Sequence, residues 1–316
     1  MSAVPAMNYR IGVDGGGTKT ECILVDSSGR LLASHAGTGC NPSVVGNEAA
    51  ASILLAALNS LRTQAVTHLA KTSGRPATGD NLVITDTLLC MAGSRGFWSE
   101  FAAGLHGFGR VVATDDSRPI LELATHGRAG LVLHAGTGSF VAARAPDQSV
   151  HYAGGLGWRF GDPGSGYDLG SRAVARALLE LQGWALPSRV GPAVRDHAQL
   201  AATVDASALA RYFYQHPDPA RHIAALAPVM LRLAAEHDDA AREIVATSTG
   251  GLLDLAVTVA TKLFTASQLP TTTAGLSGPI LTHPFVLQSL AARSPMPLGV
   301  IADTPIEGVR QLLVRL

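Results

Sequence analysis

The sequence predicts an α/β protein with two lobes, in which strands and helices alternate through both halves. Three observations support this prediction. The chain has 316 residues, enough for about two domains of ~150 residues each. A group of three strand-like runs, the first two joined by a glycine-rich turn, begins near Arg10, and a second such group begins at Gly130. Helical segments follow each group, so the organisation repeats although the residues do not.

The first half contains short runs rich in Ile, Val and Leu that are bounded by Gly, Ser and Asp, as is typical of strands. An alanine- and leucine-rich segment, with Asn47 as its cap, predicts a helix that ends near Val66. The expected strands are residues 10–14, 20–26, 30–34, 82–91 and 110–114; a surface loop is expected at 71–80 and a second helix at 118–125.

The second half repeats the group of three strands and then becomes mostly helical. The expected strands are residues 130–134, 140–144, 150–153, 272–276 and 298–302; helices are expected to dominate 172–264, and a closing helix is expected at 306–316. We place the first lobe at residues 1–118 and the second at residues 119–303.

Composition argues against several classes of function. The chain has 24 basic and 24 acidic residues, and such a balance is unfavourable for coating nucleic acid or an anionic membrane. No apolar run of ~20 residues is free of proline or charge, so we expect no membrane span. The first nine residues carry no basic group, which argues against a secretory signal. Three widely spaced cysteines suggest neither a disulfide framework nor a zinc site, and we expect a cytoplasmic protein.

The first candidate functional segment follows the first expected strand. Asp14 precedes the residues Gly15, Gly16, Gly17, Thr18 and Lys19. Backbone N–H groups of such a turn can bind phosphate, with Thr18 adding a hydroxyl donor and Lys19 a positive charge. Asp14 at the strand end could hold a hydrated Mg²⁺. The spacing fits neither a Walker A loop nor GxGxxG, and a simple glycine-rich hairpin turn is the alternative.

A second turn of the same kind follows the strand at 130–134. Its residues are Gly136, Thr137, Gly138 and Ser139. One such turn is weak evidence, but two, each within a group of three strands, favour two lobes that hold one polyphosphate between them.

Between the two turns, Asp115 and Asp116 follow the strand at 110–114. Phosphoryl transfer to an alcohol requires a carboxylate within hydrogen-bond reach of the attacking hydroxyl. Either aspartate could instead cap the helix at 118–125, and the sequence alone does not decide between the two roles.

A third segment, residues 154–170, contains seven glycines. Glycine destabilises regular structure by roughly 0.5–1 kcal/mol relative to alanine, so this density suggests close approach of the backbone to a ligand. Trp158, Phe160 and Tyr167 are unlike the composition of a flexible linker, and we interpret the segment as a substrate-binding loop.

In this order, the motifs resemble those of the BadF/BadG/BcrA/BcrD-type ATPase family, which includes N-acetylglucosamine kinase and glucosamine kinase. That family lies within the sugar-kinase, hsp70 and actin superfamily. The resemblance implies an actin-like (ribonuclease H-like) ATPase fold in each lobe, a mixed sheet flanked by helices. It also implies that the helix at 304–316 packs back on the first lobe.

The resemblance further implies a kinase that uses ATP and Mg²⁺ to phosphorylate the 6-hydroxyl of an amino sugar, N-acetylglucosamine first. Asp115 would be the base, and Asp14 would orient the metal. The implied sugar contacts are Asn41, Asp115, Gly154, Gly155 and Asp162; the implied phosphate contacts are Thr18 and Thr137 with their turns; the implied adenosine contacts are Gly275 and Gly278. A homodimer is also implied, with no nucleic-acid or membrane partner.

The exact sugar stays open. Leu156 stands where N-acetylglucosamine kinases of the family have tryptophan, and Pro163 replaces an acidic residue. Glucosamine, glucose and N-acetylmuramate are therefore alternatives. The same family contains ATPases that activate dehydratases or reductases through a [4Fe–4S] cluster. This alternative is disfavoured, because no cysteine follows Cys90 and the cluster needs thiolate ligands beyond the second turn.

Overall fold

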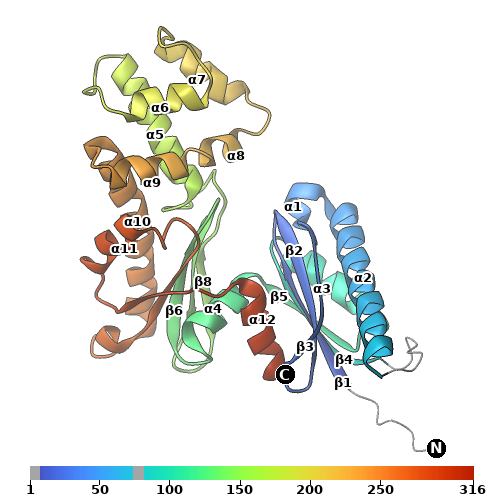
Figure 1. The fold of residues 1–316 in the computed structure, drawn as a ribbon. Helices are drawn as coiled ribbons and strands as arrows, with labels where there is room; N and C mark the ends of the chain where they lie inside the picture. Colours follow the sequence, from blue (N-terminus) through green and yellow to red (C-terminus); the bar gives the residue numbers. More distant parts are fainter. Residues whose placement is uncertain (1–7, 74–81) are drawn as a thin grey trace, which may run out of the picture. The chain divides into compact units, whose positions relative to one another are not determined.

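The computed structural model describes residues 8–73 and 82–316. The first seven residues and most of the predicted 71–80 loop lie outside the described part. The chain divides into two compact units, Met1–His126 with Asp303–Leu316, and Gly127–Ala302 (Figure 1).

The first unit contains a five-stranded mixed sheet in the order β3-β2-β1-β4-β5. Strands β1, β2 and β3 are antiparallel neighbours, whereas β4 and β5 run parallel to β1. The strands are β1 (Asn8–Gly15), β2 (Lys19–Asp26), β3 (Leu31–Thr38), β4 (Val83–Met91) and β5 (Arg110–Asp115); the helices are α1 (Pro42–Val45), α2 (Asn47–Ser73), α3 (Arg95–Gly104), α4 (Ser117–Thr125) and α12 (Pro305–Val314).

Helices cover both faces of this sheet, because the strands carry apolar side chains at successive positions. Ile11 and Val13 of β1 share a buried cluster with Leu54 and Leu58 of α2. On the opposite face, Ile23 and Val25 of β2 pack with Val309 and Leu313 of α12. The C-terminal helix is thus part of the core of the first unit, although about 180 residues separate it from α4.

The second unit repeats this plan with a sheet in the order β8-β7-β6-β9-β10. Strands β6, β7 and β8 are antiparallel neighbours, and β9 and β10 run parallel to β6. The strands are β6 (Gly130–Ala135), β7 (Ser139–Arg144), β8 (Val150–Gly154), β9 (Ala274–Ser277) and β10 (Leu298–Val300); the helices are α5 (Gly166–Leu181), α6 (Val190–His197), α7 (Ala206–Gln215), α8 (Pro219–Ala224), α9 (Ala227–Ala235), α10 (Asp239–Leu263), the short 3₁₀ helix η2 (Leu269–Thr271) and α11 (Pro284–Ala291).

Helix α10 supplies much of the core of the second unit. Leu252, Leu253 and Ala256 are buried with Leu131 and Leu133 of β6. Among the described residues, α10 is also the one helix long and apolar enough to cross a membrane, judged by length and composition, and half of its most apolar stretch is buried. Because that buried part belongs to the core, we assign α10 as a core helix.

The predicted α/β fold with two mixed sheets is confirmed, and several element boundaries differ from prediction. Helix α2 continues to Ser73 instead of ending near Val66. Asn47 is the first residue of α2 and not its cap. The short helix α1, which precedes α2, is capped by Asn41, whose side chain accepts a hydrogen bond from the N–H of Ser43 (2.9 Å). Helix α3, which buries Trp98, was not predicted.

Helix α5 begins at Gly166, six residues earlier than predicted, so part of the glycine-rich segment is helical. Ser165 caps it by accepting a hydrogen bond from the N–H of Asp168 (3.1 Å). Gly170 lies inside α5, where a Cβ atom would stand 1.9 Å from the carbonyl oxygen of Ile223. This glycine therefore permits close packing of α5 against α8, and its presence does not require a ligand.

Candidate active site

The first glycine turn connects β1 to β2. The N–H of Gly16 donates to the carbonyl of Lys19 (2.9 Å), and the carbonyls of Gly15 and Gly16 accept from the N–H groups of Ala92 (2.8 Å) and Cys40 (3.1 Å). Within the described part of the chain, nothing accepts a hydrogen bond from the N–H of Gly17 or Thr18, and both residues are exposed. These two donors are therefore available to an anion.

Space around the turn also fits a bound anion. A Cβ atom at Gly17 would meet only the Val44 side chain, at 3.9 Å. Packing therefore does not require glycine here, and the open side leaves room for a ligand. Lys19, by contrast, forms an ion pair with Glu21 (2.7 Å), so its charge is already balanced within β2.

Carboxylates lie at the ends of β1 and β5 of the first sheet, with β4 between them. Asp14 at the end of β1 lies in register with Cys90 of β4, and Asp115 at the end of β5 lies in register with Met91. Burial first, then Asp116 and Glu21, raise the pKa of Asp14 to about 7. Burial and the neighbouring Asp115 raise the pKa of Asp116 to about 6. Negative charge at each of these acids therefore has a neighbouring carboxylate that opposes it, and a cation bound nearby would lower that cost. Among residues 8–73 and 82–316, no three His, Cys, Asp or Glu side chains are grouped as a metal site.

Asp115 and Asp116 have different surroundings. The Asp115 carboxylate accepts a hydrogen bond from the Arg95 guanidinium (2.6 Å) and another from the Ser117 hydroxyl. Asp116 stands at the N-cap position of α4 but makes no side-chain capping bond. The Asp115 carboxylate is thus held in a fixed orientation, whereas the Asp116 carboxylate has no such side-chain partner among residues 8–73 and 82–316.

The second glycine turn, between β6 and β7, packs against the first turn of α5. The N–H of Gly136 donates to the carbonyl of Gly138 (2.9 Å). The carbonyls of Gly136 and Thr137 accept from the N–H groups of Gly166 (2.8 Å) and Tyr167 (3.4 Å) at the start of α5. The turn therefore lies at the N-terminus of a sixteen-residue helix, where the helix dipole favours an anion.

The segment predicted to bind sugar comes together with this second turn. The N–H of Gly155 donates to the carbonyl of Ser139 (3.0 Å), and Gly154 lies in register with Phe140. Asp162 is mostly buried and accepts a hydrogen bond from the N–H of Gly157 (3.3 Å), and burial raises its pKa. The geometry brings these predicted residues into one group.

Gly275 and Gly278 differ in their placement. Gly275 is buried within β9, in register with Val132. Gly278 has a φ of +89°, and a Cβ atom there would stand 2.2 Å from the carbonyl oxygen of Ala135. Gly278 is therefore the residue that lets the chain after β9 lie directly against the end of β6.

Replacing Gly278 by alanine should destabilise this arrangement. We expect a loss of about 3–4 kcal/mol in the free energy of unfolding, because the substitution adds a backbone clash to left-handed strain. Gly183→Ala is the matched control: its φ is +79° with nothing within 4 Å of a Cβ atom, so about 1–2 kcal/mol is expected. Urea unfolding measures both, and equal losses would contradict the clash.

His134, next to the second turn, gives the protein a predictable response to acid. Its imidazole bonds to the Ser277 hydroxyl (3.2 Å) and stacks on Phe140, and burial lowers its pKa from 6.5 to about 4. Between these values the unfolded chain binds a proton that the folded protein does not, so stability falls as pH falls.

From pH 7.5 to pH 5, His134 should cost the wild type about 2 kcal/mol of unfolding free energy. The variant His134→Asn should lose less over the same interval, as measured by urea unfolding at the two pH values. An identical pH dependence in the two proteins would refute this assignment.

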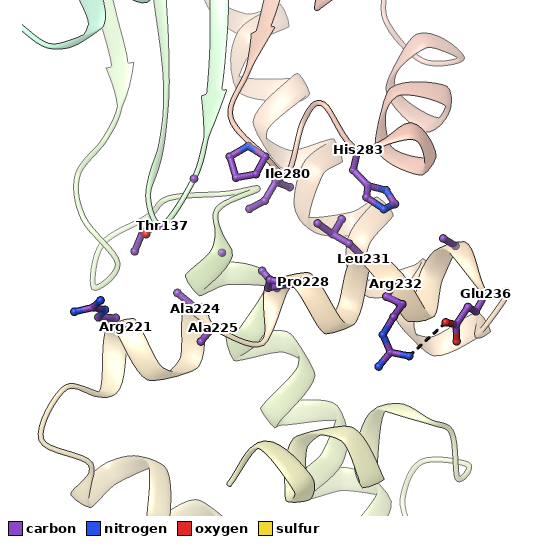
Figure 2. A pocket seen from close by; sticks show the side chains of 15 residues that line it. Thr137, Arg221, Ala224, Ala225, Pro228, Leu231, Arg232, Glu236, Ile280 and His283 are labelled. Carbon is purple, nitrogen blue, oxygen red and sulfur yellow. Dashed lines mark hydrogen bonds and ion pairs between the residues drawn. The ribbon is translucent and has the colours of Figure 1, made fainter. Parts of the chain in front are cut away.

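A cavity of about 740 Å³ opens beside the second turn, within the second unit (Figure 2). Figure 2 shows Thr137 and Arg221 at one end and the Arg232–Glu236 ion pair (3.3 Å) at the other. Small and apolar side chains form most of the wall between them. The lining residues are Gly136, Thr137, Gly166, Arg221, Ala224, Ala225, Ala227, Pro228, Leu231, Arg232, Ala235, Glu236, Pro279, Ile280 and His283.

Of the residues that line this cavity, those of the second glycine turn were predicted from the sequence, and most of the others were not. Most of these residues come from α8, from α9 and from the segment between β9 and α11, and no motif marks them. One local sequence feature does point to the cavity: Pro279 and Ile280 directly follow Gly278, which the family resemblance implies as an adenosine contact.

Two sheets with the same strand plan, each with a glycine turn after its first strand, define the class of actin-like α/β proteins. A family model extends this to a particular family: the chain belongs to the BadF/BadG/BcrA/BcrD ATPase family, whose model matches residues 11–275. The family predicted from the motifs is therefore confirmed.

Curated relatives and solved structures agree with this family. An N-acetylmuramic acid/N-acetylglucosamine kinase from Clostridium acetobutylicum is 27% identical over 179 residues, 54% of either chain. A glucosamine kinase from Vibrio cholerae is 27% identical over 180 residues, 56% of this chain and 57% of the relative. The matches thus span about half the length of these relatives.

A solved structure from Chromobacterium violaceum, provisionally described as an N-acetylglucosamine kinase, is 26% identical. The match covers 98% of this chain and 100% of that one, with a TM-score of 0.72. A similarly described structure from Porphyromonas gingivalis, at 19% identity, covers 96% and 98% with a TM-score of 0.68 and shows the fold alone.

Proposed function

We propose that the protein is an ATP-dependent sugar kinase that phosphorylates the 6-hydroxyl of an amino sugar, N-acetylglucosamine first. The observation that carries the proposal is the repeated glycine turn after the first strand of each sheet, with the second turn at one end of a cavity. Its volume of about 740 Å³ falls within the ~300–1,000 Å³ typical of small-molecule sites. The named activities of the relatives support the same class.

In this proposal the nucleoside occupies the cavity and the phosphates bind both turns. Gly15–Lys19 and Gly136–Ser139 would supply backbone donors, with the Thr18 and Thr137 hydroxyls added. Gly278 would shape the cavity through its contact with the end of β6, with Gly275 behind it in the strand. Mg²⁺ would be held by Asp14, and when bound it would neutralise phosphate charge.

Asn41, Gly154, Gly155 and Asp162 would hold the sugar hydroxyls. The side-chain oxygen of Asn41 already caps α1, so its amide N–H₂ group is the part free to donate. Asp115 would orient the 6-hydroxyl and accept its proton while the γ-phosphoryl group transfers in line. The hydrogen bonds from Arg95 and Ser117 would hold the accepting carboxylate in place.

An ADP-release assay over N-acetylglucosamine, glucosamine, N-acetylmuramate and glucose tests the proposal. Sugar-dependent release is expected, with the highest kcat/KM on N-acetylglucosamine; a higher value on glucosamine would instead identify a glucosamine kinase. ATP hydrolysis that does not depend on any sugar would contradict a kinase. A homodimer and a cytoplasmic location stay predictions.

A further inference from the structure

Arg221 lies at the same end of the cavity as the second glycine turn. Arg221 was not predicted as a site residue from the sequence. It lies on α8 and lines the cavity together with Thr137 and Gly136 (Figure 2). Its backbone N–H donates to the Asp218 side chain (3.2 Å), which caps α8. Arg221 is therefore fixed in the first turn of α8, and the packing of α8 determines where its side chain begins.

Close backbone packing holds α8 against the start of α5. The missing side chain of Gly170 allows the carbonyl of Ile223 to approach, and a Cβ atom at Gly166 would stand 3.2 Å from the carbonyl of Ala224. Gly166 also donates its N–H to the carbonyl of Gly136 in the turn. Arg221 and the phosphate-binding turn are thus attached to the same first turn of α5.

The Arg221 guanidinium makes no ion pair and no side-chain hydrogen bond with any residue in 8–73 or 82–316. The other cation that lines the cavity, Arg232, is paired with Glu236 at the opposite end. In the first turn, Lys19 is paired with Glu21. An unpaired guanidinium beside backbone donors presents up to five N–H groups in a geometry that suits a phosphate.

From these contacts we propose that Arg221 binds a non-transferred phosphate, α or β, of the nucleotide. The inference rests on the proposed function, because it takes the cavity as the nucleoside site. The two ends of the cavity then have different tasks. The end with Thr137 and Arg221 holds the anionic phosphates next to the nucleoside, and the end with Arg232 and Glu236 lies toward the base.

Calorimetric titration of wild type, Arg221→Ala and Arg221→Lys with ADP, AMP and adenosine tests this assignment. Arg221→Ala should weaken ADP binding roughly tenfold to hundredfold, the usual range for a charge-assisted hydrogen bond, and leave adenosine binding unchanged. Arg221→Lys should recover part of the loss. Retention of AMP affinity in Arg221→Ala would assign the contact to the β-phosphate.

Arg211→Ala is the matched control, because it removes an arginine from the neighbouring helix α7 that does not line the cavity. It should bind ADP as wild type does, and both alanine variants should keep the wild-type melting temperature. ADP affinity within twofold of wild type in Arg221→Ala, or an equal loss for adenosine, would overturn the inference while leaving the kinase proposal intact. A wild-type protein that binds no nucleotide would overturn both.

Discussion

Replacing Asp115 by asparagine is expected to lower kcat by ~10²–10⁴-fold and to change the KM for the sugar by less than about threefold. Asparagine keeps the size of the side chain and an oxygen that can accept from Arg95 or Ser117. It removes the capacity to take a proton from the attacking hydroxyl. Steady-state kinetics with the best sugar of the panel measure both constants.

Asp116→Asn is the control that separates the two neighbouring carboxylates. It should retain most of kcat if Asp115 is the base. Asp116 is a competitor supported by the structure, because its pKa of about 6 suits a base near neutral pH and its side chain makes no capping bond to α4. A base must be deprotonated, so kcat/KM would then fall as pH falls through about 6, and this fall would disappear in Asp116→Asn. That result, with Asp115→Asn near wild type, would transfer the role to Asp116.

The strands could be predicted because apolar β-branched runs between turn residues occur locally in the sequence. Their ends could not be predicted to the residue: β1 begins two residues before the expected Arg10, and β3 continues to Thr38. Pairing with neighbours extends a strand beyond its apolar run, and no local pattern records that pairing.

Helix α3 shows a different limit. Two glycines, Gly96 and Gly104, weaken its local propensity, and it is stabilised by distant contacts. Trp98 is buried among residues from other elements, and its indole N–H donates to the carbonyl of Ala92 (2.9 Å). Ser94, which caps the helix, was the one local signal, and a lone serine is too common to identify a helix.

For the candidate site, the sequence indicated which residues form the turns but not what they contact. Lys19 has the right type and position for a phosphate contact, yet Glu21, two residues along the same strand, balances its charge. The cavity wall comes from helices whose residues carry no motif, so Arg221 could be found only after the helices were packed. Short motifs specify backbone turns, whereas the side chains that surround those turns depend on tertiary structure.

Replacing Asp14 by asparagine should reduce catalysis and stabilise the fold at the same time. We expect kcat/KM to fall by at least ~10²-fold, because the proposed metal contact loses its charge. Without metal, the free energy of unfolding at pH 8 should rise by about 1–3 kcal/mol. Burial and nearby acids raise the pKa of Asp14 from 3.8 to about 7, so ionising it costs the folded protein more than the unfolded chain.

Because the pKa of Asp14 is raised on folding, the wild type is most stable below pH 3.8 and loses unfolding free energy as pH rises through about 7. Asparagine does not ionise, so the variant does not have this loss. Urea unfolding in EDTA should therefore show a larger gain at pH 8 than at pH 5. Glu21→Gln is the control, because it also removes an acid near Asp14 but breaks the ion pair with Lys19, and no gain is expected. Added Mg²⁺ with ADP should stabilise the wild type more than Asp14→Asn. A variant that is less stable than wild type at both pH values would show that Asp14 supports the fold and not the metal.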